Sequence, residues 1–156
     1  MERNDDIEKA LSYAYRLLKL RPRSSWELRG RLLQKRFKGT TARETIDLLK
    51  EKHFLDDAAF ARSWVESRMN SRPSGAILIR RELRAKGVET ELIDEALRSL
   101  KDNEASILRD LAEKKLGLLK DASREEKRRR LFGYLAQRGF AFDAIEEVLR
   151  DIAGKN

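Results

Sequence analysis

Basic side chains dominate one early stretch of this chain. Between Lys9 and Arg43 there are eleven lysines and arginines and a single acid, Glu27. Charge of one sign over that length suits a polyanionic partner, with nucleic acid as the first candidate, although a basic surface can also serve solubility alone. Guanidinium groups bind carboxylates as readily as phosphates, so an acidic protein surface is a second candidate.

Helical spacing predicts which of these cations could act together. Arg29 and Arg36 are seven positions apart, and Arg31 and Lys35 are four apart, so each pair would share a face of a helix. Arg16 and Lys19, on the preceding predicted helix, add two more cations. The predicted contact residues for an anionic partner are Arg16, Lys19, Arg23, Arg29, Arg31, Lys35 and Arg36.

Two aromatic residues lie in the same stretch. Tyr13 and Trp26 could stack on unpaired bases. The commoner role for a lone tryptophan near a helix start is to fill the core, and we expect that role for Trp26.

The sequence offers little support for catalysis or metal binding. Asp56 and Asp57 are adjacent, and adjacent helical residues point apart, so we expect them to cap a helix start. His53 is the only histidine and cysteine is absent, which excludes disulfides and thiolate metal sites. No glycine-rich phosphate loop or nucleophile–base pair is visible. We expect no enzyme activity, no metal and no cofactor.

The rest of the chain carries less net charge. Residues 1–53 have a formal charge of +6, residues 54–100 of zero and residues 101–156 of +2. A second basic cluster, Lys127–Arg130, occupies four consecutive positions, which spread around a helix rather than forming one patch. A solvated helix is the better interpretation of that cluster.

A threefold repeat organises these features. Leu32 and Phe37, Leu83 and Val88, and Leu135 and Phe140 each pair a leucine with an apolar residue five positions later. A period near fifty residues predicts tandem supersecondary units, which usually present an extended surface to a large partner. We predict three units, over residues 6–53, 54–100 and 101–154.

Each unit should contain three helices. Apolar spacing near 3.6 and the absence of sustained alternation predict an all-α protein, an elongated and curved array of three tandem three-helix repeats. Gly87 and Gly139 should end the second helices of the later repeats.

The second helix of the first repeat should begin at Ser24 or Ser25, with Glu27 placed for a capping box. We expect Gly39 to end this helix and Thr41 to cap the next one.

Several stretches resemble the RecX family, the regulators of RecA recombinase. Ser24–Arg29 with Leu32-Leu33 resembles the start of the first core motif of that family. His53–Asp57 with Phe60-Ala61 resembles the glycine-leucine-leucine-aspartate-aspartate signature that is followed by phenylalanine-alanine. Arg80–Val88 resembles the second core motif. The first repeat departs from the family pattern, with Lys35-Arg36-Phe37 in place of lysine, glycine and an apolar residue.

The resemblance implies a non-enzymatic regulator that binds in the groove of the RecA–DNA filament and slows filament extension, strand exchange and ATP hydrolysis. The residues alone leave two alternatives open. One is a helix-turn-helix DNA-binding regulator, against which the acidic third helices argue. The other is a helical scaffold that never meets single- or double-stranded DNA.

The sequence also allows a prediction of cellular location and oligomeric state. The charged N-terminus leads into no apolar signal segment, and no apolar run reaches bilayer length. We therefore expect a cytoplasmic protein with no membrane contact, and a monomer.

Overall fold

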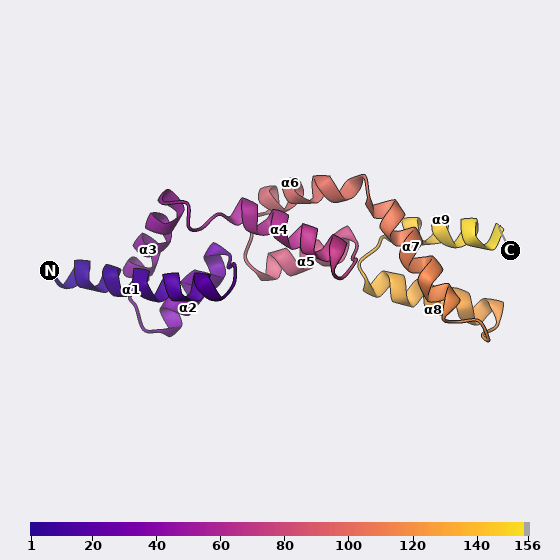
Figure 1. Ribbon diagram of the computed structural model, residues 1–156, viewed down its shortest axis with the longest axis horizontal. Coiled ribbons are helices and arrows are strands. Elements are labelled where there is room, and N and C mark those ends of the chain that lie inside the picture. The colour runs from indigo at the N-terminus through magenta and orange to yellow at the C-terminus, as the bar shows by residue number, and fades with distance from the viewer. Residues whose placement is uncertain (155–156) are drawn as a thin grey trace. The chain divides into compact units, whose positions relative to one another are not determined.

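The chain is entirely helical over residues 1–154, the part described by this computed structural model (Figure 1). This confirms the predicted all-α class with three helices in each repeat. Within that range the helices are α1 (Glu2–Leu20), α2 (Ser25–Gln34), α3 (Gly39–Glu51), α4 (Asp57–Asn70), α5 (Ala76–Ala85), α6 (Thr90–Lys101), α7 (Glu104–Gly117), α8 (Arg124–Gln137) and α9 (Phe142–Gly154).

The chain divides into two compact parts, which we describe separately. The N-terminal part contains residues 1–61 and 83–93, and the C-terminal part contains residues 62–82 and those from 94 onward. The predicted limits of the three repeats stay a prediction. Below, the first, second and third triplets are α1–α3, α4–α6 and α7–α9.

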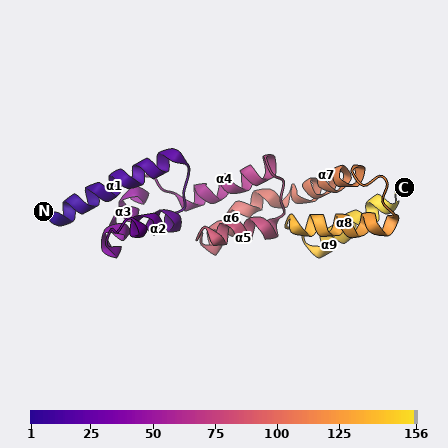
Figure 2. The same ribbon diagram turned by 90° about the horizontal axis from the view of Figure 1, so that it is seen from below.

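The first triplet packs around small and aliphatic side chains. Its buried residues are Ala10, Ala14 and Leu17 of α1, Leu28 and Leu32 of α2, and Ala42, Ile46 and Leu49 of α3. Figure 2 shows α1 lying across both of its partners. Because alanines face α2 and α3, the long helix can approach them closely. This leaves the cations of α1 and α2 on the outside.

The third triplet repeats the plan with a more aliphatic core. Leu108 and Leu111 of α7, Leu131 and Leu135 of α8, and Ile145, Val148 and Leu149 of α9 are buried together. In Figure 2, α7 lies across α8 and α9 in the same manner as α1 in its own triplet.

One backbone turn ends the second helix of each triplet. Gly87 and Gly139 have φ of 73° and 90°, and Arg36 takes the same left-handed conformation with φ 76°. In each case the N–H of the next residue donates to a carbonyl five positions back, for example Phe37 to Leu32 at 3.2 Å. The predicted ends at Gly87 and Gly139 are confirmed.

The predicted end of the first repeat's second helix at Gly39 is wrong. α2 ends at Gln34 and Gly39 is the first residue of α3. The chain has already reversed at Arg36, so Lys38, in extended conformation, occupies the N-cap position. Thr41 therefore does not cap α3. It lies buried inside the helix, where its carbonyl accepts the Thr45 hydroxyl at 2.7 Å.

The start of α2 meets the turn after α5, in a contact we call the first junction. The Ser24 hydroxyl donates to the Lys86 carbonyl, and Asp57 Oδ1 accepts the Ser25 N–H at 2.8 Å. A side chain at Gly87 would overlap Trp26 Cβ. All of these residues belong to the N-terminal part.

The start of α5 meets the turn after α8 in the same way, in the second junction. Gly75 N–H donates to the Arg138 carbonyl at 2.7 Å, and Ile77 N–H donates to that of Gly139 at 3.1 Å. Glu104 Oε1 accepts the Ala76 N–H at 3.0 Å, as Asp57 does for Ser25. These residues belong to the C-terminal part.

Candidate functional site

A complete capping box begins α2. The Ser24 hydroxyl accepts the Glu27 N–H at 3.2 Å, and Glu27 Oε1 accepts the Ser24 N–H at 3.3 Å. The prediction of a capping box at these residues is confirmed. Both free N–H groups are satisfied within four residues, which fixes the direction in which the first turn of α2 projects its side chains.

Trp26 extends from that first turn into solvent. Its side chain is 60% exposed, so the expectation that it fills the core is wrong. The core face of α2 is made by Leu28 and Leu32, and Trp26 lies outside it. The base of the side chain and one edge of its ring are covered, where Cβ, Cγ and Cδ2 lie next to Gly87.

A shallow hollow of about 460 Å³ adjoins the indole, and we call it the Trp26 hollow. It is lined by Arg21, Arg23, Trp26, Glu27, Gly30, Arg31 and Gln34. Two predicted contact residues, Arg23 and Arg31, meet here. Arg21, Gly30 and Gln34 were not predicted, although Gly30 lies four positions after Trp26 and so shares its helical face.

A second hollow of about 450 Å³ surrounds the ring of Tyr13, and we call it the Tyr13 hollow. The Arg16 guanidinium lies 5.8 Å and Lys35 Nζ 5.4 Å from the ring centroid. Two predicted contact residues, one on α1 and one at the C-cap of α2, therefore share one aromatic ring. The hollow is lined by Asp5, Glu8, Lys9, Ser12, Tyr13, Arg16, Lys35 and Phe37.

Arg23 is the least accessible of the predicted contact residues. It is 9% exposed, and its Nε donates to the Leu17 carbonyl at 3.3 Å. Burial, followed by the neighbouring Arg21 and Arg31 cations, lowers the pKa of its guanidinium. Arg23 thus ties the segment before α2 to the end of α1, and its charge adds to that of the neighbouring cations.

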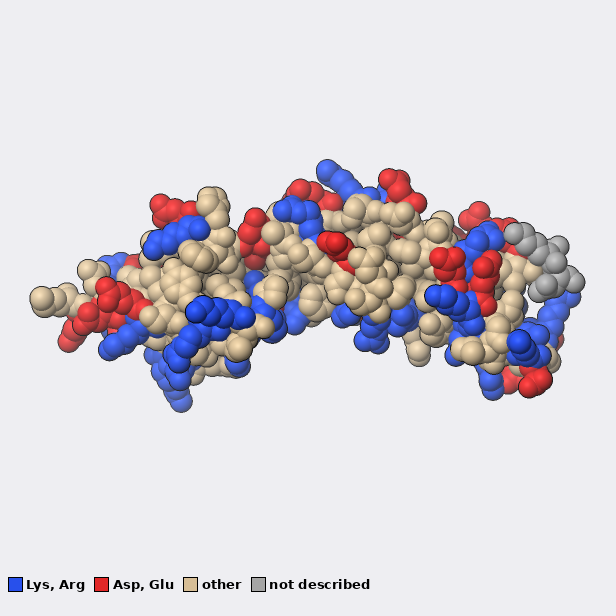
Figure 3. All heavy atoms as spheres, viewed as in Figure 1, with Lys and Arg blue, Asp and Glu red and all other residues tan. Residues whose placement is uncertain are grey.

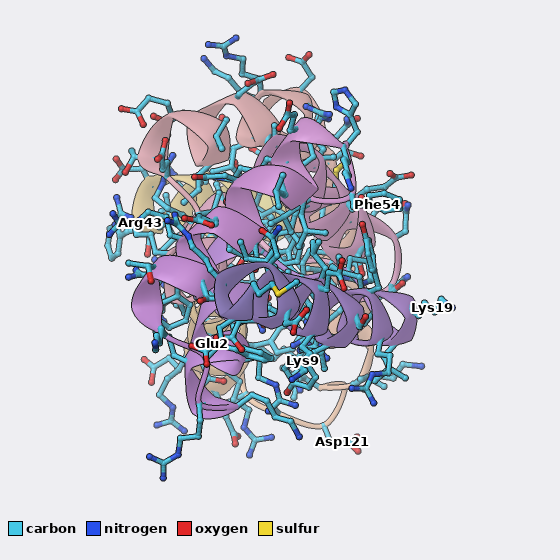
Figure 4. The ribbon with its side chains drawn as sticks, turned by 90° about the vertical axis from the view of Figure 1, so that its left-hand side faces the viewer. Glu2, Lys9, Lys19, Arg43, Phe54 and Asp121 are labelled. Atoms are coloured by element: carbon cyan, nitrogen blue, oxygen red, sulfur yellow. The ribbon has the colours of Figure 1, made fainter. Side chains whose placement is uncertain are left out.

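The other predicted residues are exposed. Lys19 projects away from the body of the triplet at the end of α1, on the opposite side from Arg43 in Figure 4. Arg29 and Arg36 do not share a helical face as predicted, because α2 ends before Arg36. Among the described residues, no ion pair is formed by Arg16, Lys19, Arg29, Arg31, Lys35 or Arg36.

The single acid of this stretch is already neutralised. Glu27 Oε2 lies 2.9 Å from Arg21 Nη2 and 3.3 Å from Lys86 Nζ. Burial alone would raise the pKa of Glu27, but the hydrogen bonds from Arg21 and the Ser24 N–H, with the charge of Lys86, lower it. Glu27 therefore does not offset the unpaired arginines beside it.

In the third triplet, several cations form ion pairs with acidic side chains. Arg128 pairs with Glu146 at 2.6 Å, Arg130 with Glu126 at 2.7 Å, and Arg109 with Asp151 at 2.8 Å. Figure 3 shows blue side chains gathered over α2, whereas blue and red lie side by side over α7–α9. The interpretation of Lys127–Arg130 as a solvated helix fits these pairs.

The described residues contain neither a metal site nor a membrane-spanning helix. Over residues 1–154 no group of three or more histidine, cysteine, aspartate or glutamate side chains is placed to hold a metal ion. Within the same range no helix combines the length and apolar character that a membrane crossing requires.

Comparison with known proteins gives one consistent result. Models of the first, second and third three-helix domains of RecX match residues 10–59, 56–97 and 102–149. A protein named Regulatory protein RecX from Prosthecochloris aestuarii is 36% identical over 149 residues, 96% of this chain and 97% of that protein. Another of that name from Streptomyces lividans is 35% identical over 147 residues, 94% of this chain and 78% of its own length.

Solved structures agree at the level of the fold. The crystal structure of RecX from Lactobacillus salivarius matches with a TM-score of 0.87 and 24% identity, over 96% of this chain and 98% of that one. A crystal structure of regulatory protein RecX matches with a TM-score of 0.85 and 23% identity, over 93% of this chain and 73% of that one. The sequence relatives, the three domain models and this shared fold together place the chain in the RecX family of regulatory proteins.

Proposed function

We propose that this protein regulates the RecA recombinase without catalysing a reaction. It binds in the groove of the RecA–DNA filament and inhibits filament extension, strand exchange and ATP hydrolysis. Membership of the RecX family over nearly the whole chain supports this role. Three linked helical units suit a polymeric target, because each weak contact raises the effective concentration of the next.

The observation that carries the proposal is the unpaired charge of the first triplet. Six predicted contact cations are exposed and make no ion pair within residues 1–154. Four of them, Arg29, Arg31, Lys35 and Arg36, lie on α2 or in the turn that follows it. Such cations attract an anionic partner over a Debye length and contribute their interaction only when that partner is bound.

The third helices of the later triplets disfavour a helix-turn-helix DNA reader. α6 carries Glu91, Asp94 and Glu95 against Arg98 and Lys101. Helix α9 is likewise acidic, with Asp143, Glu146, Glu147 and Asp151 against Arg150. Recognition helices with this charge would repel the phosphates that border a DNA groove.

The test is the DNA-dependent ATPase of RecA with this protein titrated in. We expect inhibition at ratios near stoichiometry. The triple substitution Arg29→Gln, Arg31→Gln, Lys35→Gln should raise the concentration for half inhibition about tenfold, since three exposed charge contacts are worth roughly 0.5 kcal/mol each.

A matched control removes three cations from α8, namely Arg124, Lys127 and Arg129, each replaced by glutamine. None of the three forms an ion pair among residues 1–154, so the control matches the test in charge and helix type. It should inhibit as the unmodified protein does. No effect of the unmodified protein on the ATPase at equimolar RecA would remove the proposed function.

A further inference from the structure

We propose that the Trp26 hollow is a binding site for an unpaired nucleotide of single-stranded DNA. The indole stacks on the base, and Arg29 and Arg31 meet the flanking phosphates. The inference deepens the proposed function, on which its biological role rests, by naming the polynucleotide rather than protein carboxylates as the partner of this surface.

The indole is open where a base would lie. Trp26 is 60% exposed, and its neighbour one helical turn on is Gly30, which has no side chain to cover it. A Cβ at Gly30 would meet no atom within 4 Å. A helical tryptophan normally packs against the side chain at i+4, so this glycine keeps the space beside the ring empty.

The indole is also held in place at its base. Trp26 Cβ and Cγ lie against Gly87, and the capping box fixes the first turn of α2 from which the side chain projects. Restriction of this kind lowers the entropy that must be lost when a ligand stacks on the ring. Trp26 thus combines an exposed face with a constrained root, as an aromatic platform requires.

The surrounding charge matches a phosphate chain. Arg29, at i+3 from Trp26, and Arg31, on the wall of the hollow, are exposed and unpaired among the described residues. Glu27 is compensated by Arg21 and Lys86. Arginines alone would bind carboxylates or phosphates, but an exposed indole on the same helix adds a stacking energy that only a base can use.

The Tyr13 hollow is a poorer platform. Arg16 and Lys35 already lie over the Tyr13 ring at 5.8 and 5.4 Å, and Phe37 packs at 6.4 Å between centroids. Two acids, Asp5 and Glu8, line it as well. A base would have to displace cations from the ring and approach uncompensated carboxylates.

The experiment compares two polyanions that differ only in their bases. Fluorescently labelled oligodeoxythymidylate of about 20 nucleotides and an abasic sugar-phosphate chain of the same length are titrated with the full-length protein, in the absence of RecA. We expect the thymidylate to bind about tenfold more tightly, since stacking on one aromatic side chain commonly contributes that much. Equal affinity for the two chains would overturn the inference.

Variants test whether Trp26 is the platform. Trp26→Leu keeps an apolar root on Gly87 but removes the stacking face, so the preference for thymidylate should disappear. Gly30→Leu leaves every charge and Trp26 in place while its side chain fills the open space, and it should remove the preference too. Gly30→Ala adds only a methyl group and should keep it.

The Gly30 variants distinguish a loss of binding from a loss of folding. Replacement of a helix-interior glycine by alanine or leucine raises helix propensity, so both Gly30 variants should fold at least as stably as the parent chain. Preference for thymidylate that survives in both Trp26→Leu and Gly30→Leu would contradict the site. Thymidylate preference without any effect on the RecA ATPase would uphold this inference while removing the proposed function.

Discussion

The two junctions share one geometry but differ in the chemistry that makes them. In the first junction, side chains form the contact: the Ser24 hydroxyl donates to the Lys86 carbonyl, and the Trp26 side chain packs against Gly87. In the second junction, the backbone forms the contact: the N–H groups of Gly75 and Ile77 donate to the carbonyls of Arg138 and Gly139. The same repeat position can therefore be satisfied by a hydroxyl or by a bare amide, provided that a left-handed glycine lies opposite.

The two junctions also differ in the residues around the contact. A backbone contact leaves no room for a side chain, and a Cβ at Gly75 would collide with the Gly139 carbonyl. At the equivalent site of α2 the contact runs through Ser24, and the root of Trp26 covers Gly87. The Trp26 residue is 60% exposed, and Ile77 at the equivalent position of α5 is 48% exposed. The first junction is the one at which we propose a binding surface, because the exposed side chain there is aromatic.

Alanine at the two junction glycines should produce the largest effect. Both glycines have positive φ. A methyl group at Gly139 would collide with backbone atoms of Leu78, whereas at Gly87 it would collide with Cβ, Cγ and Cδ2 of Trp26, of which only Cγ and Cδ2 can turn away. We expect Gly139→Ala to lower the free energy of unfolding by about 2–4 kcal/mol and Gly87→Ala by about 1–2 kcal/mol. Urea unfolding measures both.

Gly133→Ala is the control for that pair, since Gly133 lies inside α8 and a Cβ there meets no atom within 4 Å. It should stabilise the protein by about 0.5–1 kcal/mol. If Gly87→Ala proved as costly as Gly139→Ala, the distinction between a side-chain junction and a backbone junction would be lost.

The ion pairs of Glu27 should make the first junction sensitive to acid. The folded protein lowers the pKa of Glu27, so its contribution to stability is complete above the ordinary carboxyl pKa and is lost as pH falls through the lowered value. Glu27→Gln should cost about 0.5–1 kcal/mol near neutral pH, and that difference should shrink as the pH falls through the lowered pKa of Glu27. Thermal unfolding of both proteins across this range provides the measurement.

At the second junction Leu78 occupies the position equivalent to Glu27, so that position carries no ionisable side chain. Leu78→Gln serves as the comparison, and the free energy that it costs should not vary with pH. A Glu27→Gln difference that persisted undiminished in acid would mean that packing, rather than charge, holds the side chain there.

Arg36→Gly should give the smallest effect. Arg36 takes the left-handed turn that Gly87 and Gly139 take elsewhere, but no junction covers it in the described structure. Glycine relieves the strain of a positive φ and adds entropy to the unfolded chain, so we expect a net gain of about 0.5 kcal/mol. Chemical denaturation would detect it, and a loss of stability would show that the Arg36 side chain contributes to the fold.

Much of the local structure was predictable from the sequence. The period near fifty residues, the capping box of Ser24 and Glu27, and the glycine turns after α5 and α8 each depend on residues close in the chain. The prediction failed at Gly39, because an arginine had taken the turn position that glycine occupies in the other repeats. Propensity alone favours the glycine, and the true turn was visible only in the spacing of Leu32 and Phe37.

The candidate site was predicted only in outline. Counting charges identified the first triplet as basic, but the count cannot tell a paired arginine from a free one. Arg128 and Arg130 are neutralised by partners that tertiary packing or a helical turn supplies, whereas Arg29 and Arg31 are left unpaired. The burial of Arg23 depends on a carbonyl at the end of another helix, and no local pattern marks it.

The amino-acid sequence by itself determined that this protein is helical, threefold repeated and basic at one end, because apolar period, capping residues and formal charge are local properties of the chain. Tertiary structure alone decided which cations stay free, which glycines face a neighbouring backbone and that Trp26 faces water. Those outcomes depend on distances between residues far apart in sequence, such as Trp26 and Gly87, which are set only when the helices pack.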